Sequence, residues 1–271
     1  MTRLPQSYLV CASQRSGSTL LVESLKATGV AGRPEEFFQY LPQTGLAPQP
    51  RQWFADVTDQ SILSLLAPLV PGAPDARDAT QWRADLLDAG RTPNGVWGGK
   101  LMWNQTPLLL ERAAELPARS GMDLLAAIAD VLGDVAFVWV RRPDVVPQAV
   151  SMWRAVQTQV WRDDPSGTED DGAQKDRAQY HPGGIAHLAA ILQGQDTSWQ
   201  RWFTDEGVEP LEIDFPTLAK DPQGTVAGVL EWLGLDPKLA PPPPIRRQGN
   251  ARSSEWVERY RADAAANGYP A

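Results

Sequence analysis

The chain has 271 residues, of which 42% are hydrophobic, and a formal net charge of −8. A chain of this size buries roughly three quarters of its unfolded surface, so we expect a single domain spanning residues 1–271. The negative net charge disfavours non-specific binding to nucleic acid, because such binding needs lysines and arginines that release counterions from phosphates. An anionic ligand would therefore need a local basic site.

The sequence also contains indications of where the protein is located. No apolar run reaches the length of a membrane span, and residues 1–13 become polar too soon for a secretory signal. The single cysteine, Cys11, excludes an internal disulfide and ends an apolar run, so we expect it to be a small buried residue. These features predict a soluble cytoplasmic protein that binds no membrane.

The predicted elements begin with a strand over residues 8–12, followed by the loop SQRSGST and a helix with leucines at helical spacing up to Gly29. Three more short strands are predicted over residues 96–101, 136–140 and 211–215. Helical patterns follow Thr106-Pro107, which suits a cap and first turn, and run onward from Asp144. Strands that alternate with helices predict an α/β fold, a P-loop-like central parallel sheet flanked by helices.

The second half of the chain contains two breaks. Residues 163–177 are acidic, small and almost without apolar side chains, which predicts a solvated loop. Four prolines at 241–244 end the last helical region before a basic loop, and a capped C-terminal helix is expected from about Ser253.

The loop SQRSGST has the design of an anion site, because backbone N–H groups of a glycine turn and the positive end of a helix point at one place. Compared with the nucleotide-hydrolase loop GxxxxGK[ST], Ala12 replaces the first glycine and Ser18 replaces the lysine. The pattern resembles the 5′-phosphosulfate loops of sulfotransferases instead, and the predicted contacts are Arg15, Ser16, Gly17, Ser18 and Thr19. A transferring sulfuryl group carries less charge than a phosphoryl group, so no metal is expected.

A second anion site is expected at another strand end, where open α/β sheets gather ligands. Arg141 and Arg142 follow a predicted strand, and Ser151 lies about two turns into the next helix, which resembles the arginine-to-serine signature for the 3′-phosphate. The spacing from Arg142 to Ser151 is nine residues rather than the family's eight, which leaves open which pair binds, and we favour Arg142. The basic loop IRRQGNARSS adds the candidates Arg246, Arg247, Gln248 and Arg252.

Transfer to a hydroxyl needs a base that accepts its proton. His181 and His187 lie far in sequence from the anion motifs, and a lone histidine is more often structural. Lys100 resembles lysines that lie near the bridging oxygen in other sulfotransferases, where a cation stabilises the leaving phosphate, although a lysine at a strand end is usually solvated.

Several segments, in the same order and spacing, resemble the bacterial trehalose 2-sulfotransferase family: SQRSGSTLLVESLKATGVAG, PEEFFQYLP, PQPRQWFADV, GRTPNGVWGGKLMWNQTPLL, RPDVVPQAVS and SSEWVERYR. The resemblance spans nearly the whole chain and implies 3′-phosphoadenosine-5′-phosphosulfate as donor, trehalose or a related sugar as acceptor, and a homodimer. It puts the catalytic base on Glu36. The implied sugar-binding positions are Gln14, Arg33, Pro34, Glu35, Glu36, Phe37, Phe38, Gln39, Pro48 and Trp53.

Three alternatives remain at this point. The acceptor could be a different glycoside or a lipid-linked sugar. A kinase that uses ATP and magnesium is disfavoured, because Ser18 stands where the nucleotide-hydrolase loop has its lysine. A nucleotide-sensing protein that retains the loops without catalysis, or a serine- and glycine-rich turn that binds nothing, is compatible with the motifs taken singly. Arg33 also stands where the family has an acidic residue, and Phe37 and Phe38 would be core residues without the resemblance.

Overall fold

The computed structural model describes residues 7–38, 50–68, 76–161, 177–244 and 251–271. Its contacts divide the chain into two compact units. The first, here the sheet unit, comprises Met1–Ala47, Ala73–Arg142 and Gln195–Ile245, and the second, here the helical unit, comprises Pro48–Gly72, Pro143–Gly194 and Arg246–Ala271. That the chain forms one domain stays a prediction. Within the described ranges, no helix is both long and apolar enough to cross a membrane.

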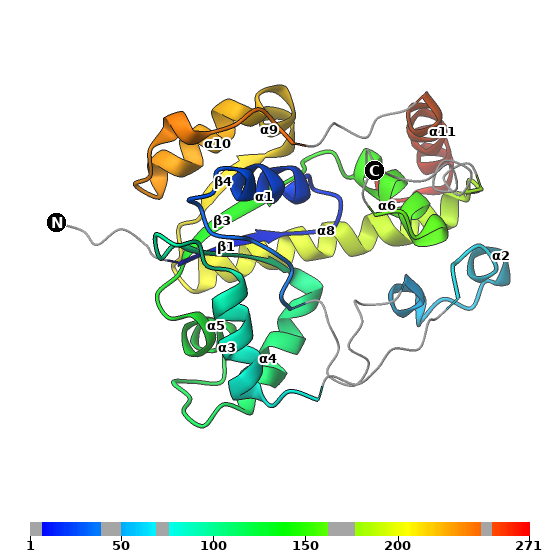
Figure 1. Ribbon diagram of the computed structural model, residues 1–271. Helices are drawn as coiled ribbons and strands as arrows, with labels where there is room; N and C mark the ends of the chain where they lie inside the picture. The colour runs from blue at the N-terminus through cyan, green and yellow to red at the C-terminus, as the bar shows by residue number, and fades with distance from the viewer. Residues whose placement is uncertain (1–6, 39–49, 69–75, 162–176, 245–250) are drawn as a thin grey trace. The chain divides into compact units, whose positions relative to one another are not determined.

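The strands of the sheet unit confirm the α/β prediction. The described residues form β1 (Ser7–Ala12), β2 (Trp97–Met102), β3 (Ala136–Arg141) and β4 (Leu211–Asp214), which pair in the order β2-β1-β3-β4 and are all parallel (Figure 1). The predicted strand ends differ from the observed ones by at most one residue. Phe215, for example, starts a helix instead of ending β4.

Alternate residues of β1 face opposite sides of the sheet, as the strand period of two requires. Leu9 and Cys11 belong to one hydrophobic cluster, whereas Tyr8, Val10 and Ala12 belong to another. Every side chain of β1 is buried, and residues 8–12 form an apolar run, which is typical of a parallel sheet covered on both faces. The predicted burial of Cys11 is confirmed, and burial raises the pKa of its thiol.

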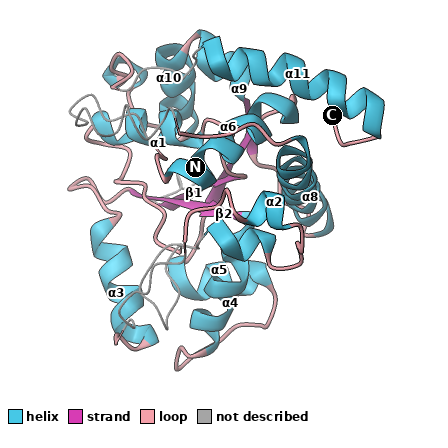
Figure 2. Cartoon of the chain, turned by 90° about the vertical axis from the view of Figure 1, so that its right-hand side faces the viewer, coloured by secondary structure: helices cyan, strands magenta, loops and turns pink. Residues whose placement is uncertain are grey.

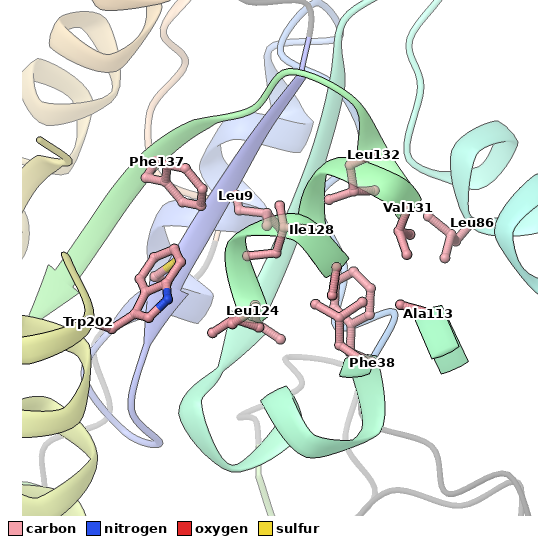
Figure 3. Packing of buried hydrophobic residues seen from close by; sticks show 14 of the residues in the cluster. Leu9, Phe38, Leu86, Ala113, Leu124, Ile128, Val131, Leu132, Phe137 and Trp202 are labelled. Carbon is pink, nitrogen blue, oxygen red and sulfur yellow. The ribbon is translucent and has the colours of Figure 1, made fainter. Parts of the chain in front are cut away.

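Helices cover both faces of this sheet (Figures 1 and 2). On the side of Leu9 lie α3 (Ala79–Ala89), α4 (Thr106–Ala114) and α5 (Leu124–Leu132), together with the end of α8 (Pro182–Asp205). Figure 3 shows Leu9 and Phe137 from the sheet packed near Ile128 and Trp202. The other face is covered by α1 (Ser18–Ala27), α9 (Phe215–Lys220) and α10 (Pro222–Trp232).

The helical unit has a core of its own. It contains the short helices η1 (Pro50–Phe54) and α2 (Gln60–Leu63), together with α6 (Val145–Thr158), α8 up to Gly194, and α11 (Ala251–Asn267). Buried aromatic and aliphatic residues from these helices pack together, among them Phe54, Trp153, Ile185, Trp256 and Tyr260.

Helix starts follow the expected capping chemistry. The side chain of Asp144 accepts a hydrogen bond from the N–H of Val146 at the start of α6, as a capping aspartate does. Thr106 is the first residue of α4 rather than its cap. Helix α11 begins at Ala251, two residues before the expected start. Residues 163–176 of the predicted acidic loop, which was expected over 163–177, lie outside the described residues.

The strand order locates the expected ligand site. The chain leaves β1 to form β2 on one side of it and later returns to form β3 on the other side. In open α/β sheets, ligands bind outside the carboxyl ends of the strands at such a switch in direction. The segment that leaves the carboxyl end of β1 is residues 13–17, the predicted phosphate loop.

Candidate functional site

The loop between β1 and α1 has an anion-binding backbone. Arg15 and Gly17 both have positive φ angles, 60° and 95°, and the N–H of Ser16 donates to the carbonyl of Ser13 at 3.4 Å. Successive amides in such mixed conformations form a concave cluster of N–H groups that suits anions, and α1 begins directly afterwards at Ser18 with its positive dipole end. A Cβ atom at Gly17 would lie 2.3 Å from Cδ2 of Phe215, so no larger residue fits there.

The side chains of the loop also suit a phosphosulfate. Ser16 is fully buried, and its Oγ has no hydrogen-bond partner among the residues that the structure describes. A buried hydroxyl without a partner is destabilising, so an anion that accepts from Ser16 would remove an existing penalty. Ser18 is buried and Thr19 half-buried at the start of α1. The residues present therefore fit the donor that the motif predicts.

Lys100 connects this loop to the predicted base. Its side chain is 1% exposed, and Nζ lies 2.6 Å from Oε1 of Glu36 and 3.4 Å from Oγ1 of Thr19. A buried ammonium group is tolerated only when it is paired, and Glu36 supplies the opposite charge. The side chain is therefore not the solvated strand-end lysine that its position in β2 would allow.

The main chain explains how Glu36 reaches β2. The N–H of Lys100 donates to the carbonyl of Glu35 at 2.9 Å, and the N–H of Arg33 donates to the carbonyl of Gly90 at 2.8 Å. The segment from Arg33 to Glu36 thus lies beside Gly90 and beside β2, which is an edge strand of the sheet. This contact brings residues 36 and 100 together although 63 residues separate them in sequence.

Gln105 is a second partner of Glu36, and sequence reasoning missed it. Its Nε2 donates to Oε2 of Glu36 at 3.0 Å, and its Oε1 accepts from the N–H of Met102 at 3.0 Å. Gln105 is 2% exposed and ends the short helix η2 (Trp103–Gln105) between β2 and α4. A glutamine four residues after the predicted strand end at Leu101 was the one available signal.

The neighbouring carboxylate, Glu35, has different surroundings. Its side chain is 42% exposed and forms an ion pair with Lys26, which also bonds Glu23. Partial burial alone would lower the pKa of Lys26, but the hydrogen bonds to Glu35 and Glu23 outweigh burial and raise this pKa. Glu35 and Glu36 are therefore held by different lysines, with Glu36 on the side of the phosphate loop.

The other predicted sugar-binding residues of the sheet unit divide into two groups. Gln14, in the phosphate loop, donates to Oδ1 of Asn104, a residue that sequence reasoning also missed. Arg33 is exposed and Pro34 is buried. The ring of Phe37 lies 5.7 Å from Trp97, and Phe38 is 2% exposed with its ring 6.1 Å from Trp82, so both contribute to core packing. Their sugar contacts, like those of Gln14, stay predictions.

The two candidate arginines point in different directions. Nη1 of Arg142 donates to the carbonyl of Arg15 at 3.1 Å, and its guanidinium lies 4.4 Å from the ring centre of Phe215, beside Gly17. Arg141 instead lies over the ring of Trp139 and pairs with two carboxylates, Asp196 at 3.4 Å and Glu212 at 3.5 Å. Arg142 is thus the one placed beside the phosphate loop.

The carboxylate that faces Arg141 has a perturbed pKa. Burial raises the pKa of Asp196, and the charge and hydrogen bond of Arg141 only partly oppose this rise. Asp196 lies on α8 and Arg141 ends β3, so this ion pair joins α8 to the sheet.

The remaining predicted contacts belong to the helical unit. Ser151 is half-buried on α6, and Arg252 of α11 donates to the carbonyl of Ala178 at 2.7 Å. The ring of Trp53 lies 6.0 Å from that of Trp161, and its carbonyl lies 2.6 Å from Nε2 of His187. Five predicted residues lie outside the described residues: Gln39, Pro48, Arg246, Arg247 and Gln248.

Both histidines have structural partners. His187 packs against Phe54 with a ring separation of 4.7 Å, and Nδ1 of His181 accepts from the N–H of Gly184 at 3.2 Å. Within the described ranges, no three or more His, Cys, Asp or Glu side chains are grouped to hold a metal ion. That the reaction needs no metal stays a prediction.

Comparison with known proteins shows the family of the chain. The family model described as Stf0 sulphotransferase matches residues 7–263. A protein of Mycolicibacterium smegmatis named trehalose 2-sulfotransferase is 60% identical, and one of the same name from Mycobacterium tuberculosis is 58% identical, each over 271 residues and 100% of both chains. The crystal structure of a sulfotransferase from Alicyclobacillus acidocaldarius is 14% identical, with a TM-score of 0.43, and covers 98% of this chain and 94% of that one. Because the family model spans most of the chain and these relatives match its full length, the chain belongs to the Stf0 sulphotransferase family.

Proposed function

We propose that this sulfotransferase transfers a sulfuryl group from 3′-phosphoadenosine-5′-phosphosulfate to the 2-hydroxyl of trehalose, with Glu36 as the general base. The names of two full-length relatives at 60% and 58% identity support the acceptor. The observation that carries the mechanism is the position of Lys100, whose Nζ contacts both Glu36 and Thr19. One buried cation thereby links the anion loop to a carboxylate that can accept a proton.

The phosphate loop and Arg142 are the proposed binding groups for the donor. The loop N–H groups, Arg15, Ser16 and Ser18 would hold the 5′-phosphosulfate, and the hydroxyl of Ser16 gains an acceptor in doing so. Arg142 is the proposed partner of the 3′-phosphate, with Ser151, Arg246, Arg247, Gln248 and Arg252 as further candidates. A guanidinium suits a phosphate because it donates two parallel hydrogen bonds.

Glu36 removes the proton from the sugar hydroxyl as that oxygen bonds to sulfur. The bond between sulfur and the bridging oxygen of the donor breaks, and its electron pair stays on the 5′-phosphate of adenosine 3′,5′-bisphosphate. The proton remains on Glu36 until solvent removes it, and the product is trehalose 2-sulfate. Lys100 would stabilise the negative charge that grows on the leaving phosphate.

The sugar contacts are proposed from the family pattern. Gln14 offers an amide and Glu35 a carboxylate for sugar hydroxyls, while aromatic faces such as Trp53 suit the apolar side of a pyranose. Arg33, Pro34, Phe37, Phe38, Gln39 and Pro48 complete the proposed set. We also propose that the protein works as a cytoplasmic homodimer, as the resembled enzymes do.

The test is to incubate the purified protein with the donor and trehalose, without added metal, and to detect sulfated disaccharide and adenosine 3′,5′-bisphosphate by mass spectrometry. We expect both products, and a panel of other glycosides should react more slowly. Donor binding without sulfated trehalose would contradict the proposed acceptor, and sulfation that required magnesium would contradict the metal-free mechanism.

The base is tested by Glu36→Gln, which keeps the shape of the side chain and removes its basicity. Turnover should fall by about two orders of magnitude or more with little change in donor affinity. Glu35→Gln is the matched control, because Glu35 is the adjacent carboxylate but pairs with Lys26 away from the loop. Near-normal turnover of Glu36→Gln would contradict the role of Glu36.

A further inference from the structure

The amide of Gln105 has one possible orientation. The N–H of Met102 can only donate, so the atom of Gln105 that faces it at 3.0 Å must be the oxygen. The nitrogen must then face Glu36, where it donates to Oε2. The main chain at the end of β2 therefore determines that Gln105 presents a donor, and not an acceptor, to the carboxylate.

Glu36 is consequently held from two sides. Oε1 faces Lys100 and Oε2 faces Gln105, and both of these partners are almost completely buried. One donor on each oxygen fixes the rotation of the carboxylate plane, which a single ion pair would not do. Each carboxylate oxygen can accept two hydrogen bonds, so the bond from Gln105 does not by itself use up the capacity of Oε2.

We propose that Gln105 is a positioning residue for the reaction: it orients the carboxylate of Glu36 and favours its ionised form. The inference rests on the proposed role of Glu36 as the base. A neutral amide donor stabilises the ionised form without forming a second ion pair that would compete with Lys100. Positioning of this kind aligns the base before the acceptor binds, which is where much of the advantage of an oriented catalytic group lies.

The chain offers a substitution that separates positioning from a structural role. Gln105→Glu keeps the length of the side chain and an oxygen for the N–H of Met102, but it replaces the donor to Glu36 with a second carboxylate. Two carboxylates that share a site make it harder to ionise both. If Gln105 only capped the end of β2, Gln105→Glu would behave like the wild type.

The experiment measures kcat and KM for both substrates over a pH series for wild type, Gln105→Ala and Gln105→Glu, with circular dichroism as the folding check. We expect kcat to fall about ten- to a hundredfold in Gln105→Ala, the usual effect of losing a hydrogen bond to a charged group. The KM for the donor should be unchanged. The acid limb of the kcat profile should move to higher pH in both variants, and further in Gln105→Glu.

A Glu36→Gln background distinguishes a failure of the positioning role of Gln105 from a failure of the proposed role of Glu36 as base. If Gln105 acts through Glu36, adding Gln105→Ala to Glu36→Gln should lower kcat no further, as expected for residues that act as a unit. An unchanged acid limb and near-normal kcat in Gln105→Glu would overturn the inference while leaving Glu36 as base. Near-normal kcat in Glu36→Gln alone would overturn the proposed base, and the positioning role with it.

Discussion

Lys100 brings a positive charge into a part of the sheet unit that is almost closed to solvent. Its side chain is 1% exposed, and burying an unpaired ammonium group would cost several kcal/mol. Glu36, whose side chain is 21% exposed, compensates that charge, so the two residues form one electrostatic unit. Any substitution of Glu36 therefore needs a stability measurement beside the activity assay, because it leaves Lys100 without its opposite charge.

Gly17 is the residue whose replacement tests the loop most directly. A Cβ atom there would lie 2.3 Å from the ring of Phe215, and the φ angle of 95° is unfavourable for any other residue. We expect Gly17→Ala to destabilise the fold and to weaken binding of adenosine 3′,5′-bisphosphate at least tenfold, because Phe215 or the loop must move. Chemical denaturation and calorimetric titration measure the two effects.

The matched control is Gly95→Ala. Gly95 has a similar φ angle of 91°, but a Cβ atom there would have nothing within 4 Å. This variant should lose only the roughly 1–2 kcal/mol of backbone strain and should bind the nucleotide normally. Equal binding by both glycine variants would show that the shape of the loop at Gly17 does not matter for the ligand.

At the level of elements, the end of β3 decides which arginine faces the loop. Arg141 shares a face with Trp139, two residues earlier, and lies over its ring. The next residue points elsewhere, because the side chains of a strand alternate, and Arg142 contacts Arg15 and Phe215. One step along the chain thus separates an arginine that pairs with carboxylates of α8 and β4 from one placed beside the anion loop.

The pairing of α8 with β3 predicts a pH effect on stability. Burial raises the pKa of Asp196 above its ordinary value of 3.8, so its contribution to stability is fully present below that value and is lost as the pH rises through the folded pKa. Asp196→Asn removes the ionisable group, so the variant does not lose stability in this way as the pH rises. The free energy of unfolding of the variant, relative to wild type, should therefore become more favourable from about pH 3.5 to about pH 7 in urea titrations.

Asp130→Asn should change in the opposite direction. Hydrogen bonds from Ser120 lower the pKa of Asp130, so its contribution to stability is present above the ordinary value and is lost as the pH falls through the folded pKa. This variant should lose relative stability as the pH rises to and just past 3.8, a lower window than that of Asp196→Asn. If both variants changed alike, the local environments of the two carboxylates would not be the cause.

At the scale of the whole molecule, the negative net charge makes the local cations decisive for an anionic ligand. The chain carries 33 acidic and 25 basic residues, yet the described part of the site presents Arg15, Lys100 and Arg142 around the end of β1 and the start of α1. Backbone dipoles of the loop add to these charges without changing the net charge. Overall acidity thus disfavours non-specific polyanion binding, while these three cations are still grouped beside the phosphate loop.

Ligand binding should stabilise the whole chain. Adenosine 3′,5′-bisphosphate at about 100 times its Kd should raise Tm by about 5–10 °C, and adenosine 5′-monophosphate should raise it less because it lacks the 3′-phosphate. Arg142→Met should abolish the difference between the two nucleotides, and Arg141→Met should keep it. The opposite result in a thermal shift series would assign the 3′-phosphate to Arg141.

Local patterns were enough to predict the four strands of the sheet and the phosphate loop. The buried strand over residues 8–12, the loop from Ser13 to Gly17 and the helix after it are contiguous in sequence, so apolar periodicity and glycine chemistry predict them without distant contacts. The same holds for the other strands, whose predicted and observed ends differ by at most one residue. The order of the strands in the sheet was not predictable from these patterns.

Tertiary structure decided the rest. The sequence predicted no role for Gln105 or Asn104. A polar residue after a strand has no distinguishing pattern until the carboxylate or amide that it contacts is known. The contact of Lys100 with Glu36 depends on a main-chain hydrogen bond between Glu35 and Lys100, which no local propensity encodes. The sequence alone therefore determined which residues could bind an anion or accept a proton, and only the packing of distant segments against the sheet decided which of them meet.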